Sequence, residues 1–190
     1  PRASTSAARP ADSRGAGGRG TPGTGARVGG TVGGGGQRVG VTANSHKGSG
    51  KPLGEGALAA SDPTLPPGRT VRIGQVAGKD AKPTCDLATP LPSDGVAVPL
   101  EVGAVNVVGG SAWVWARTEL AGKPDVLFVD EAGQLSLATA AAFGPAAASI
   151  VLLGDPQQLD QPLQGTHPPG AERNALAHLL AGKATRPAYP

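Results

Sequence analysis

The chain has 190 residues, of which 31 are glycine and 19 are proline, and its formal net charge is +3. One cysteine and three scattered histidines exclude a disulfide framework and a Cys/His metal site. No apolar run approaches the roughly 20 residues that a membrane-spanning helix needs, so we expect a reducing, cytoplasmic location and no membrane partner.

Residues 1–36 show neither helical nor strand periodicity and end in four glycines. Of the 31 glycines, 17 lie within residues 1–60, which also hold eight Lys or Arg residues against two acidic ones. Such a composition cannot bury enough apolar surface to form a packed core. We predict that residues 1–36 are disordered. Their basic side chains either meet nucleic-acid phosphates or form a solvated tail.

The first strand is predicted at Arg38–Ala43, a short apolar run that leads into the polar segment Asn44–Lys47. Residues 48–100 are rich in Pro, Gly and Asp and contain only brief apolar islands, such as Val71–Ile73. We interpret residues 48–100 as a loop-rich insertion. Residues 37–190 are then one domain that contains this insertion.

Further strands are predicted from residue 105 onward. Val105–Val108 is a short apolar run, and the alternation of the two tryptophans within Trp113–Trp115 favours an extended segment. With only five aromatic residues in the chain, these tryptophans are interpreted as core or interface residues rather than as platforms for bases. Val126–Asp130 is a continuous apolar run that ends in a carboxylate, which is typical of a strand buried on both faces of a parallel sheet. Ile150–Gly154 is a second fully apolar strand, and Asp155 follows it directly.

Two helices complete the predicted architecture. Leu135–Ala142 is rich in Ala and Leu and predicts a helix that is interrupted near Gly144 and Pro145. Gly170–Gly182 predicts a final helix with one apolar face. Strand, helix and strand within about 30 residues form a βαβ unit, so the expected fold class is α/β with a parallel sheet.

Each of the last two predicted strands leads into a turn with a carboxylate and an amide. These turns are residues 130–134 (DEAGQ) and 154–159 (GDPQQL). Because parallel strands end at one edge of a sheet, we expect Asp130 and Asp155 to be neighbours, where open α/β sheets bind ligands. An acidic pair can divide two tasks, since one carboxylate orients Mg²⁺ and the next polarises an attacking water. Each Asp alone is more commonly a strand terminator or a helix cap.

The segment VLFVDEAGQ (126–134), followed by IVLLGDPQQLDQP (150–162), resembles motifs II and III of superfamily 1 helicases with an Asp-Glu-Ala-x-Gln box. Three further segments resemble, more narrowly, bacterial helicases fused to a RecB-like nuclease domain, namely VGVTANSHK, VVGGSAWVWAR and QGTHPPGAERNALAHLL. The likeness covers residues 37–47 and 104–182. It implies an incomplete P-loop NTPase (RecA-like) domain of a helicase that hydrolyses ATP to translocate on single-stranded DNA, with a nuclease domain as a possible partner in the same parent polypeptide.

The resemblance also implies roles for single residues. Asp130 corresponds to the carboxylate associated with Mg²⁺, Glu131 to the base for water attack, and Gln134 and Gln158 to sensors that link the γ-phosphate to nucleic acid. The match to motif Ia implies contacts with single-stranded DNA from five residues, Thr42, Ala43, Ser45, His46 and Lys47. Without the family, the same segment is an ordinary polar turn in which Lys47 is available for phosphate.

A phosphate-binding loop needs glycines for close backbone approach, a Lys for the β- and γ-phosphates and a hydroxyl for Mg²⁺. Residues 20–25 (GTPGTG) have the G-x-x-x-x-G spacing. Four of them are candidate contacts to ATP, namely Gly20, Gly23, Thr24 and Gly25. Ala26 and Arg27 follow where the motif requires Lys and Ser or Thr, so we expect impaired nucleotide binding, because a guanidinium is a poor substitute for the compact ammonium.

The sequence ends at Pro190, before the motifs and the arginine finger of a second RecA-like domain, so the expectation is a partial first domain with negligible activity alone. One alternative is a non-catalytic nucleic-acid-binding remnant that uses the basic arm and the motif Ia segment. Another is a hydrolase that holds two metal ions with Asp130, Glu131 and Asp155, although a His ligand is lacking nearby. A Ser/His/Asp hydrolase is excluded, since no G-x-S-x-G elbow occurs.

Overall fold

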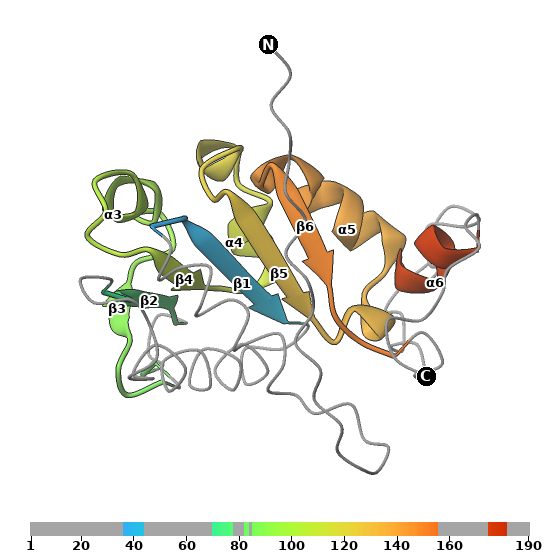
Figure 1. Ribbon diagram of the computed structural model, residues 1–190, viewed down its shortest axis with the longest axis horizontal. Helices are drawn as coiled ribbons and strands as arrows, with labels where there is room; N and C mark the ends of the chain where they lie inside the picture. Colours follow the sequence, from blue (N-terminus) through green and yellow to red (C-terminus); the bar gives the residue numbers. More distant parts are fainter. Residues whose placement is uncertain (1–35, 44–69, 78–81, 84, 156–174, 182–190) are drawn as a thin grey trace, which may run out of the picture.

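The computed structural model describes residues 36–43, 70–77, 82–83, 85–155 and 175–181. Within these residues six strands form one sheet in the order β3-β2-β4-β1-β5-β6, and every pairing is parallel (Figure 1). The strands are β1 (Val39–Ala43), β2 (Ile73–Val76), β3 (Thr89–Leu91), β4 (Val107–Gly109), β5 (Val126–Asp130) and β6 (Ser149–Leu152). The predicted α/β class with a parallel sheet is therefore confirmed.

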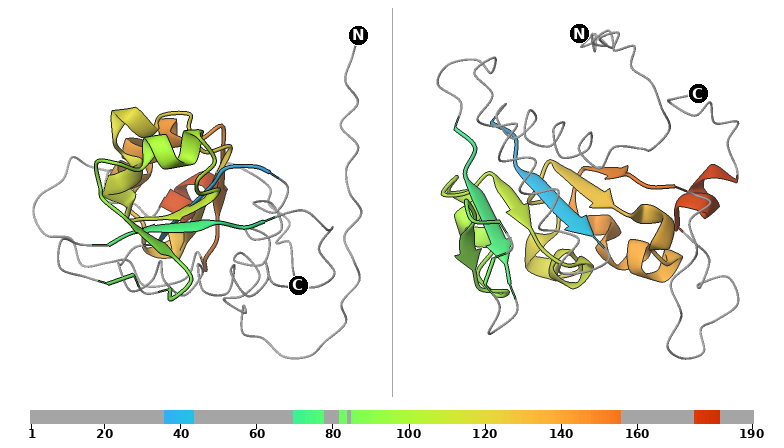
Figure 2. Two further views of the ribbon diagram at one scale, coloured as in Figure 1. Left: turned by 90° about the vertical axis from the view of Figure 1, so that its left-hand side faces the viewer. Right: turned by 90° about the horizontal axis from the view of Figure 1, so that it is seen from below.

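The described helices are short, and none is long and apolar enough to cross a membrane. They are α3 (Ala97–Glu101), α4 (Ala112–Trp115), α5 (Leu137–Phe143) and α6 (Ala175–Leu180), with the 3-10 turns η1 (Thr118–Leu120), η2 (Ala132–Gln134) and η3 (Gly144–Ala146). Figure 2 shows α3, α4 and α5 on the same side of the sheet. The start of α5 is capped by Ser136, whose Oγ accepts a hydrogen bond from the Thr139 amide at 3.2 Å.

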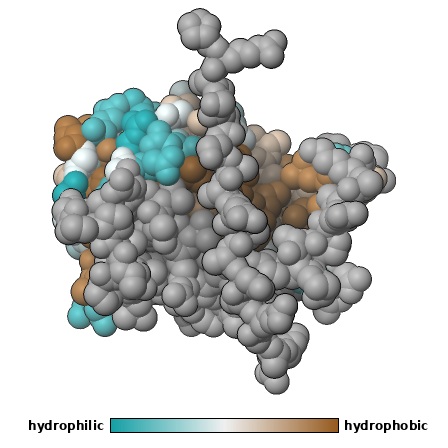
Figure 3. Space-filling model, in the orientation of Figure 1, coloured by the Kyte–Doolittle hydropathy of each residue, from teal (hydrophilic) through white to brown (hydrophobic). Residues whose placement is uncertain are grey.

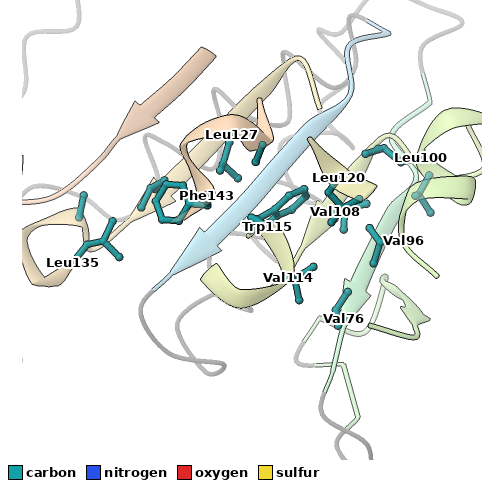
Figure 4. Close-up of a cluster of buried hydrophobic side chains, with 14 of the residues drawn as sticks. Val76, Val96, Leu100, Val108, Val114, Trp115, Leu120, Leu127, Leu135 and Phe143 are labelled. Carbon is teal, nitrogen blue, oxygen red and sulfur yellow. The ribbon is translucent and has the colours of Figure 1, made fainter. Parts of the chain in front are cut away.

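The main hydrophobic core lies between these helices and the sheet. Figure 4 shows Trp115 of α4 beside β1, with other buried side chains around it, among them Leu127, Leu120, Val108 and Phe143. The Trp115 Nε1 donates to the Val41 carbonyl of β1 at 3.3 Å. A Cβ on Gly40 would lie 2.9 Å from Trp115 Cη2 and 2.8 Å from Leu127 Cδ1, so the absence of a side chain there lets α4 pack closely on β1.

The opposite face of the sheet carries a second cluster of buried side chains, Val39, Val41, Ile73, Cys85, Val107 and Phe128. Strand β5 contributes to both clusters, because Phe128 faces this side while Leu127 and Val129 face the helices. Its three central residues are buried. The prediction that Val126–Asp130 is buried on both faces of the sheet is confirmed.

The extended segment predicted at Trp113–Trp115 is wrong, because these residues belong to helix α4. Trp115 is buried at 1% exposure, whereas Trp113 is 77% exposed. A core position is therefore confirmed for Trp115, whereas an interface role for the exposed Trp113 stays a prediction. Three residues of alternation also fit one helical turn, and in a helix Val114 and Trp115 can both face the sheet.

The described part of segment 48–100 contains β2, β3 and most of α3, none of which the sequence predicts. All four residues of β2 are buried between β3 and β4. Gly74 and Gln75 interrupt its apolar pattern for local reasons. A Cβ on Gly74 would lie 2.5 Å from Leu91 Cδ1, and the Gln75 Oε1 accepts a hydrogen bond from the Cys85 amide at 3.2 Å.

Strand β6 is observed where a strand is predicted at Ile150–Gly154, but it begins and ends earlier. It spans Ser149–Leu152, and its first two residues are exposed, with Ile150 at 36%. The exposure agrees with its place as the terminal strand of the described sheet. Figure 3 shows hydrophobic surface in the region of β6 and α6. The helix predicted over Gly170–Gly182 is observed as α6, while residues 170–174 and 182 lie outside the described part.

The amino ends of β1 and β5 are joined by a paired network. Arg38 donates from its backbone nitrogen to Asp125 Oδ2 at 2.7 Å and from Nη2 to Asp125 Oδ1 at 2.9 Å. The Asp125 amide donates back to the Arg38 carbonyl at 2.8 Å. The side-chain hydrogen bond from Arg38, followed by the backbone one, lowers the pKa of Asp125 below its ordinary value.

Candidate functional site

Four neighbouring strands end together at one edge of the sheet, because β4, β1, β5 and β6 are parallel. In register, Thr42 of β1 lies opposite Val129, and Ala43 lies opposite Asp130. Val129 in turn lies opposite Leu152 of β6. The turns that follow β5 and β6 therefore leave the sheet side by side, at the edge where open α/β sheets bind ligands.

The turn after β5 has an unusual backbone. Glu131 adopts φ 54° and ψ 35°, the left-handed conformation, and it alone among the described non-glycine residues has positive φ. This conformation costs an L-residue roughly 1–2 kcal/mol. The Glu131 amide donates to Asp130 Oδ1 at 3.0 Å, and the Gln134 amide donates to the Glu131 carbonyl at 2.9 Å. The chain thus reverses directly after Asp130, which leaves both carboxylates half-buried.

The turn after β6 lies directly against this first turn. The Ala132 amide donates to the Leu153 carbonyl at 2.8 Å. A Cβ on Gly154 would lie 2.9 Å from the backbone nitrogens of both Ala132 and Gly133. Asp155, the next residue, is exposed. The turns that carry Asp130 and Asp155 therefore meet at one edge of the sheet, while the closeness of the two carboxylates stays a prediction.

Helix α6 supports the first turn from another side. The Ala175 amide donates to the Leu135 carbonyl at 2.8 Å, directly after η2. Ala132 and Ala175 are both fully buried, and Leu135 is 4% exposed. The short turn η2, which ends in Gln134, is therefore held between α6 and the Leu153–Gly154 segment.

Thr42 lies on the helical face of β1, since it is two residues from Gly40. Thr42 is 1% exposed. Among the described residues, its Oγ1 is the one buried side-chain polar atom without a hydrogen-bond partner. The hydroxyl is thus covered rather than presented at the surface. Contact between Thr42 and a nucleic acid stays a prediction that requires this hydroxyl to become uncovered.

Asp130, Glu131 and Gln134 lie in one turn, which contacts the Leu153–Gly154 segment just before Asp155, and Thr42 and the Ala43 backbone lie on the neighbouring strand. The remaining predicted site residues lie outside the described part, namely Gly20, Gly23, Thr24, Gly25, Ser45, His46, Lys47 and Gln158. Their predicted contacts with ATP or DNA therefore stay predictions.

The carboxylates of the site fit a single Mg²⁺ ion better than a two-metal centre. Within the described ranges, no group of three or more His, Cys, Asp or Glu side chains is placed to hold a metal ion. The three-carboxylate cluster of the two-metal hydrolase alternative is thus not found. Mg²⁺ commonly uses one or two carboxylates and takes its other ligands from water and phosphate. Asp130 fits that donor set, because a carboxylate that accepts the Glu131 amide retains further lone pairs.

No family model matches the chain, and no curated protein matches it.

Sequence reasoning missed two features of the site. The sequence analysis predicts no role for Gly154 beyond its place in the second turn. A glycine between an apolar strand and a polar turn is nevertheless a signal of close backbone approach. The left-handed conformation of Glu131 gives no signal in the sequence, because Glu is not a residue that favours positive φ.

Proposed function

We propose that the chain is part of the first RecA-like domain of a superfamily 1 DNA helicase, and that the Asp130–Glu131 turn is its ATP-hydrolysing turn. One observation carries the proposal. Two polar turns follow neighbouring parallel strands and touch through their backbones, and the first holds Glu131 in a strained conformation beside Asp130. Strained residues persist only where the surrounding structure holds them in place, and they are found most often at active sites.

The residues divide the chemistry of hydrolysis between them. Mg²⁺, when bound with ATP, neutralises the charge on the phosphates. Asp130 would hold the water shell of the ion. The Glu131 carboxylate would accept a proton from the attacking water as its oxygen bonds to the γ-phosphorus and the bond to the bridging oxygen of ADP breaks. Gln134, at the end of η2, would contact the γ-phosphate without adding negative charge.

The test restores the Lys and Thr that the phosphate-binding motif requires after Gly25. We insert Lys-Thr between Gly25 and Ala26 in the full chain and measure Mg²⁺-dependent binding of a fluorescent ATP analogue. A hydrogen bond to a charged group contributes about 1.5–3 kcal/mol, so affinity should rise by roughly 10-fold or more. Without a second RecA-like domain turnover should stay slow, and whatever turnover the inserted form shows should disappear in its Glu131→Gln variant.

An Ala-Ala insertion at the same point is the matched control, since it changes the length and not the chemistry. Equal affinities for ATP in the Lys-Thr and Ala-Ala forms would contradict the proposal. Turnover that survives Glu131→Gln would reject Glu131 as the base, whatever the affinity.

A non-catalytic nucleic-acid-binding role is the second candidate, and the absence of Lys after Gly25 favours it. Residues 1–60 carry eight basic side chains against two acidic ones. Binding through phosphates would weaken steeply as salt rises. Anisotropy of a labelled single-stranded oligonucleotide at increasing salt measures this slope. Salt-sensitive binding combined with equal ATP affinities of the Lys-Thr and Ala-Ala forms would select this candidate over the ATPase.

A further inference from the structure

We propose that Gly154 is a positioning residue, which fixes the backbone of the Asp130–Glu131 turn from the neighbouring strand. The inference deepens the proposed function and rests on it, because it concerns how Glu131 is held. Its starting point is the contact between the two turns. The Leu153 carbonyl accepts the Ala132 amide at 2.8 Å, one residue after Glu131.

Only a glycine fits at position 154 for two separate reasons. Its φ is +154°, in a region that side chains of L-residues rarely adopt. A Cβ there would also lie 2.9 Å from the nitrogens of Ala132 and Gly133 and 3.4 Å from the carbonyl carbon of Glu131. All three are backbone atoms, so no flexible side chain can swing away to relieve the contact.

A side chain at position 154 must therefore push the two turns apart. Ordinary van der Waals contact begins at 3.4 Å, so contacts of 2.9 Å have to lengthen by 0.5 Å, the difference between these distances. The Ala132–Leu153 hydrogen bond lies in the path of that movement. The strained φ of Glu131 persists only while its surroundings hold it, so the turn should relax once this hydrogen bond weakens.

Other contacts hold η2 from the α6 side and do not replace this one. Ala175 donates to Leu135, which is four residues beyond Glu131. The contact with Gly154 reaches Glu131 itself and the two residues that follow it. The side of the turn next to β6 thus sets the direction of the Glu131 backbone.

The test is Gly154→Ala in the full chain, compared with Gly122→Ala. Gly122 also has positive φ, at +67°, but a Cβ there meets nothing within 4 Å, and the residue lies in the turn after η1. The control thus reproduces a strained backbone without the clash. Amide exchange of Ala132 and the intraresidue amide–Hα NOE of Glu131, which is strong at positive φ, are measured by NMR.

We expect Gly154→Ala to speed exchange of the Ala132 amide by about 10-fold or more, the effect of losing roughly one hydrogen bond, and to weaken the Glu131 NOE. Exchange at Leu127 and Val129 in β5 should change no more than in Gly122→Ala. Wild-type exchange and an unchanged NOE in a folded Gly154→Ala protein would overturn the proposal. If that variant does not fold, the wild-type protein decides, because an unprotected Ala132 amide there would overturn the proposal equally.

A kinetic measurement separates this inference from the proposed function. In the Lys-Thr form, Gly154→Ala should lower kcat by about 10- to 100-fold with KM unchanged, since a misplaced base affects the transition state and not ATP binding. Unfolded protein would lower the apparent kcat in the same way, so turnover is expressed per folded molecule, with the folded fraction taken from the NMR spectra. An unchanged kcat in an active Lys-Thr form would overturn the positioning role. A Lys-Thr form that binds ATP no better than the Ala-Ala form refutes the proposed function, and in that case, or where turnover is too slow to measure, the NMR comparison decides the positioning role by itself.

Discussion

At the scale of single residues, Glu131 combines a carboxylate with a backbone conformation that favours glycine. Replacing Glu131 with Gly relieves the left-handed strain, whereas replacing it with Ala removes the carboxylate and keeps the strain. We expect Glu131→Gly to be more stable than Glu131→Ala by about 1 kcal/mol. Urea unfolding of both variants measures the difference. Equal free energies of unfolding would mean that the chain does not hold position 131 at positive φ.

The buried hydroxyl of Thr42 predicts a stabilising substitution. An unsatisfied buried hydroxyl costs about 1–3 kcal/mol, and valine has nearly the same shape without the polar atom. Thr42→Val should therefore raise the free energy of unfolding by about 1 kcal/mol. The control is Thr139→Val, because the Thr139 Oγ1 lies 2.9 Å from the Ser136 Oγ and should lose a hydrogen bond. A destabilised Thr42→Val protein would show that the hydroxyl has a partner in solution.

At the scale of elements, the Arg38–Asp125 pair connects the amino ends of β1 and β5. The lowered pKa of Asp125 means that the folded state favours the ionised carboxylate, so its contribution is present above the unfolded pKa of about 3.9 and is lost as pH falls through the folded value. Both side chains are more than a third exposed, so we expect less than about 1 kcal/mol at pH 7.

Asp125→Asn tests this connection. The variant should be slightly less stable than the wild type at pH 7. The gap should begin to close below about pH 4 and should vanish once the pH has fallen through the lowered pKa of folded Asp125. Urea unfolding across this range measures the difference. Glu119→Gln is the control, since Glu119 pairs with Arg117 only two residues away and joins no separate elements. A gap that stays constant down to pH 2 would contradict the assignment to ionised Asp125.

Sequence periodicity predicts the elements that are apolar without interruption and misses those that depend on distant partners. Val126–Asp130 is recognisable as a buried strand because its apolar side chains alternate between two buried clusters, one on each face of the sheet. Strand β2 contains Gly74 and Gln75, whose roles come from Leu91 and Cys85, and these contacts exist only after folding. Helix α4 is a single turn, shorter than the window over which helical and strand periods differ.

For the candidate site, the sequence predicts the chemistry and the shared edge but not the backbone. The carboxylates and amides after β5 and β6 are visible in the sequence, and parallel pairing places the ends of these two strands side by side. The strained Glu131 and the close approach of Gly154 arise from contacts between two turns that are 20 residues apart or more in the chain. The glycine signals a close backbone approach, but no local pattern identifies the segment that approaches it.

At the scale of the whole molecule, the described sheet separates two kinds of interaction at opposite ends of its strands. The carboxyl ends carry the two polar turns, and the amino ends of β1 and β5 carry the Arg38–Asp125 pair. Because the strands are parallel, this separation holds along the sheet from β4 to β6. Substitutions at Asp125 should accordingly change stability and leave the turn of Glu131 in place.

The two edge strands of the described sheet have unequal surfaces. Strand β3 contains Pro90, which offers no amide to another chain, whereas β6 reads Ser-Ile-Val-Leu, without a charge or a proline, and leaves Ile150 exposed. Natural proteins protect sheet edges from other chains with prolines, charges or short strands. The unprotected edge affects the tendency of the protein to aggregate in solution. Of the described strands, β6 is the one with which another chain would pair most readily, so its edge would favour aggregation at high concentration.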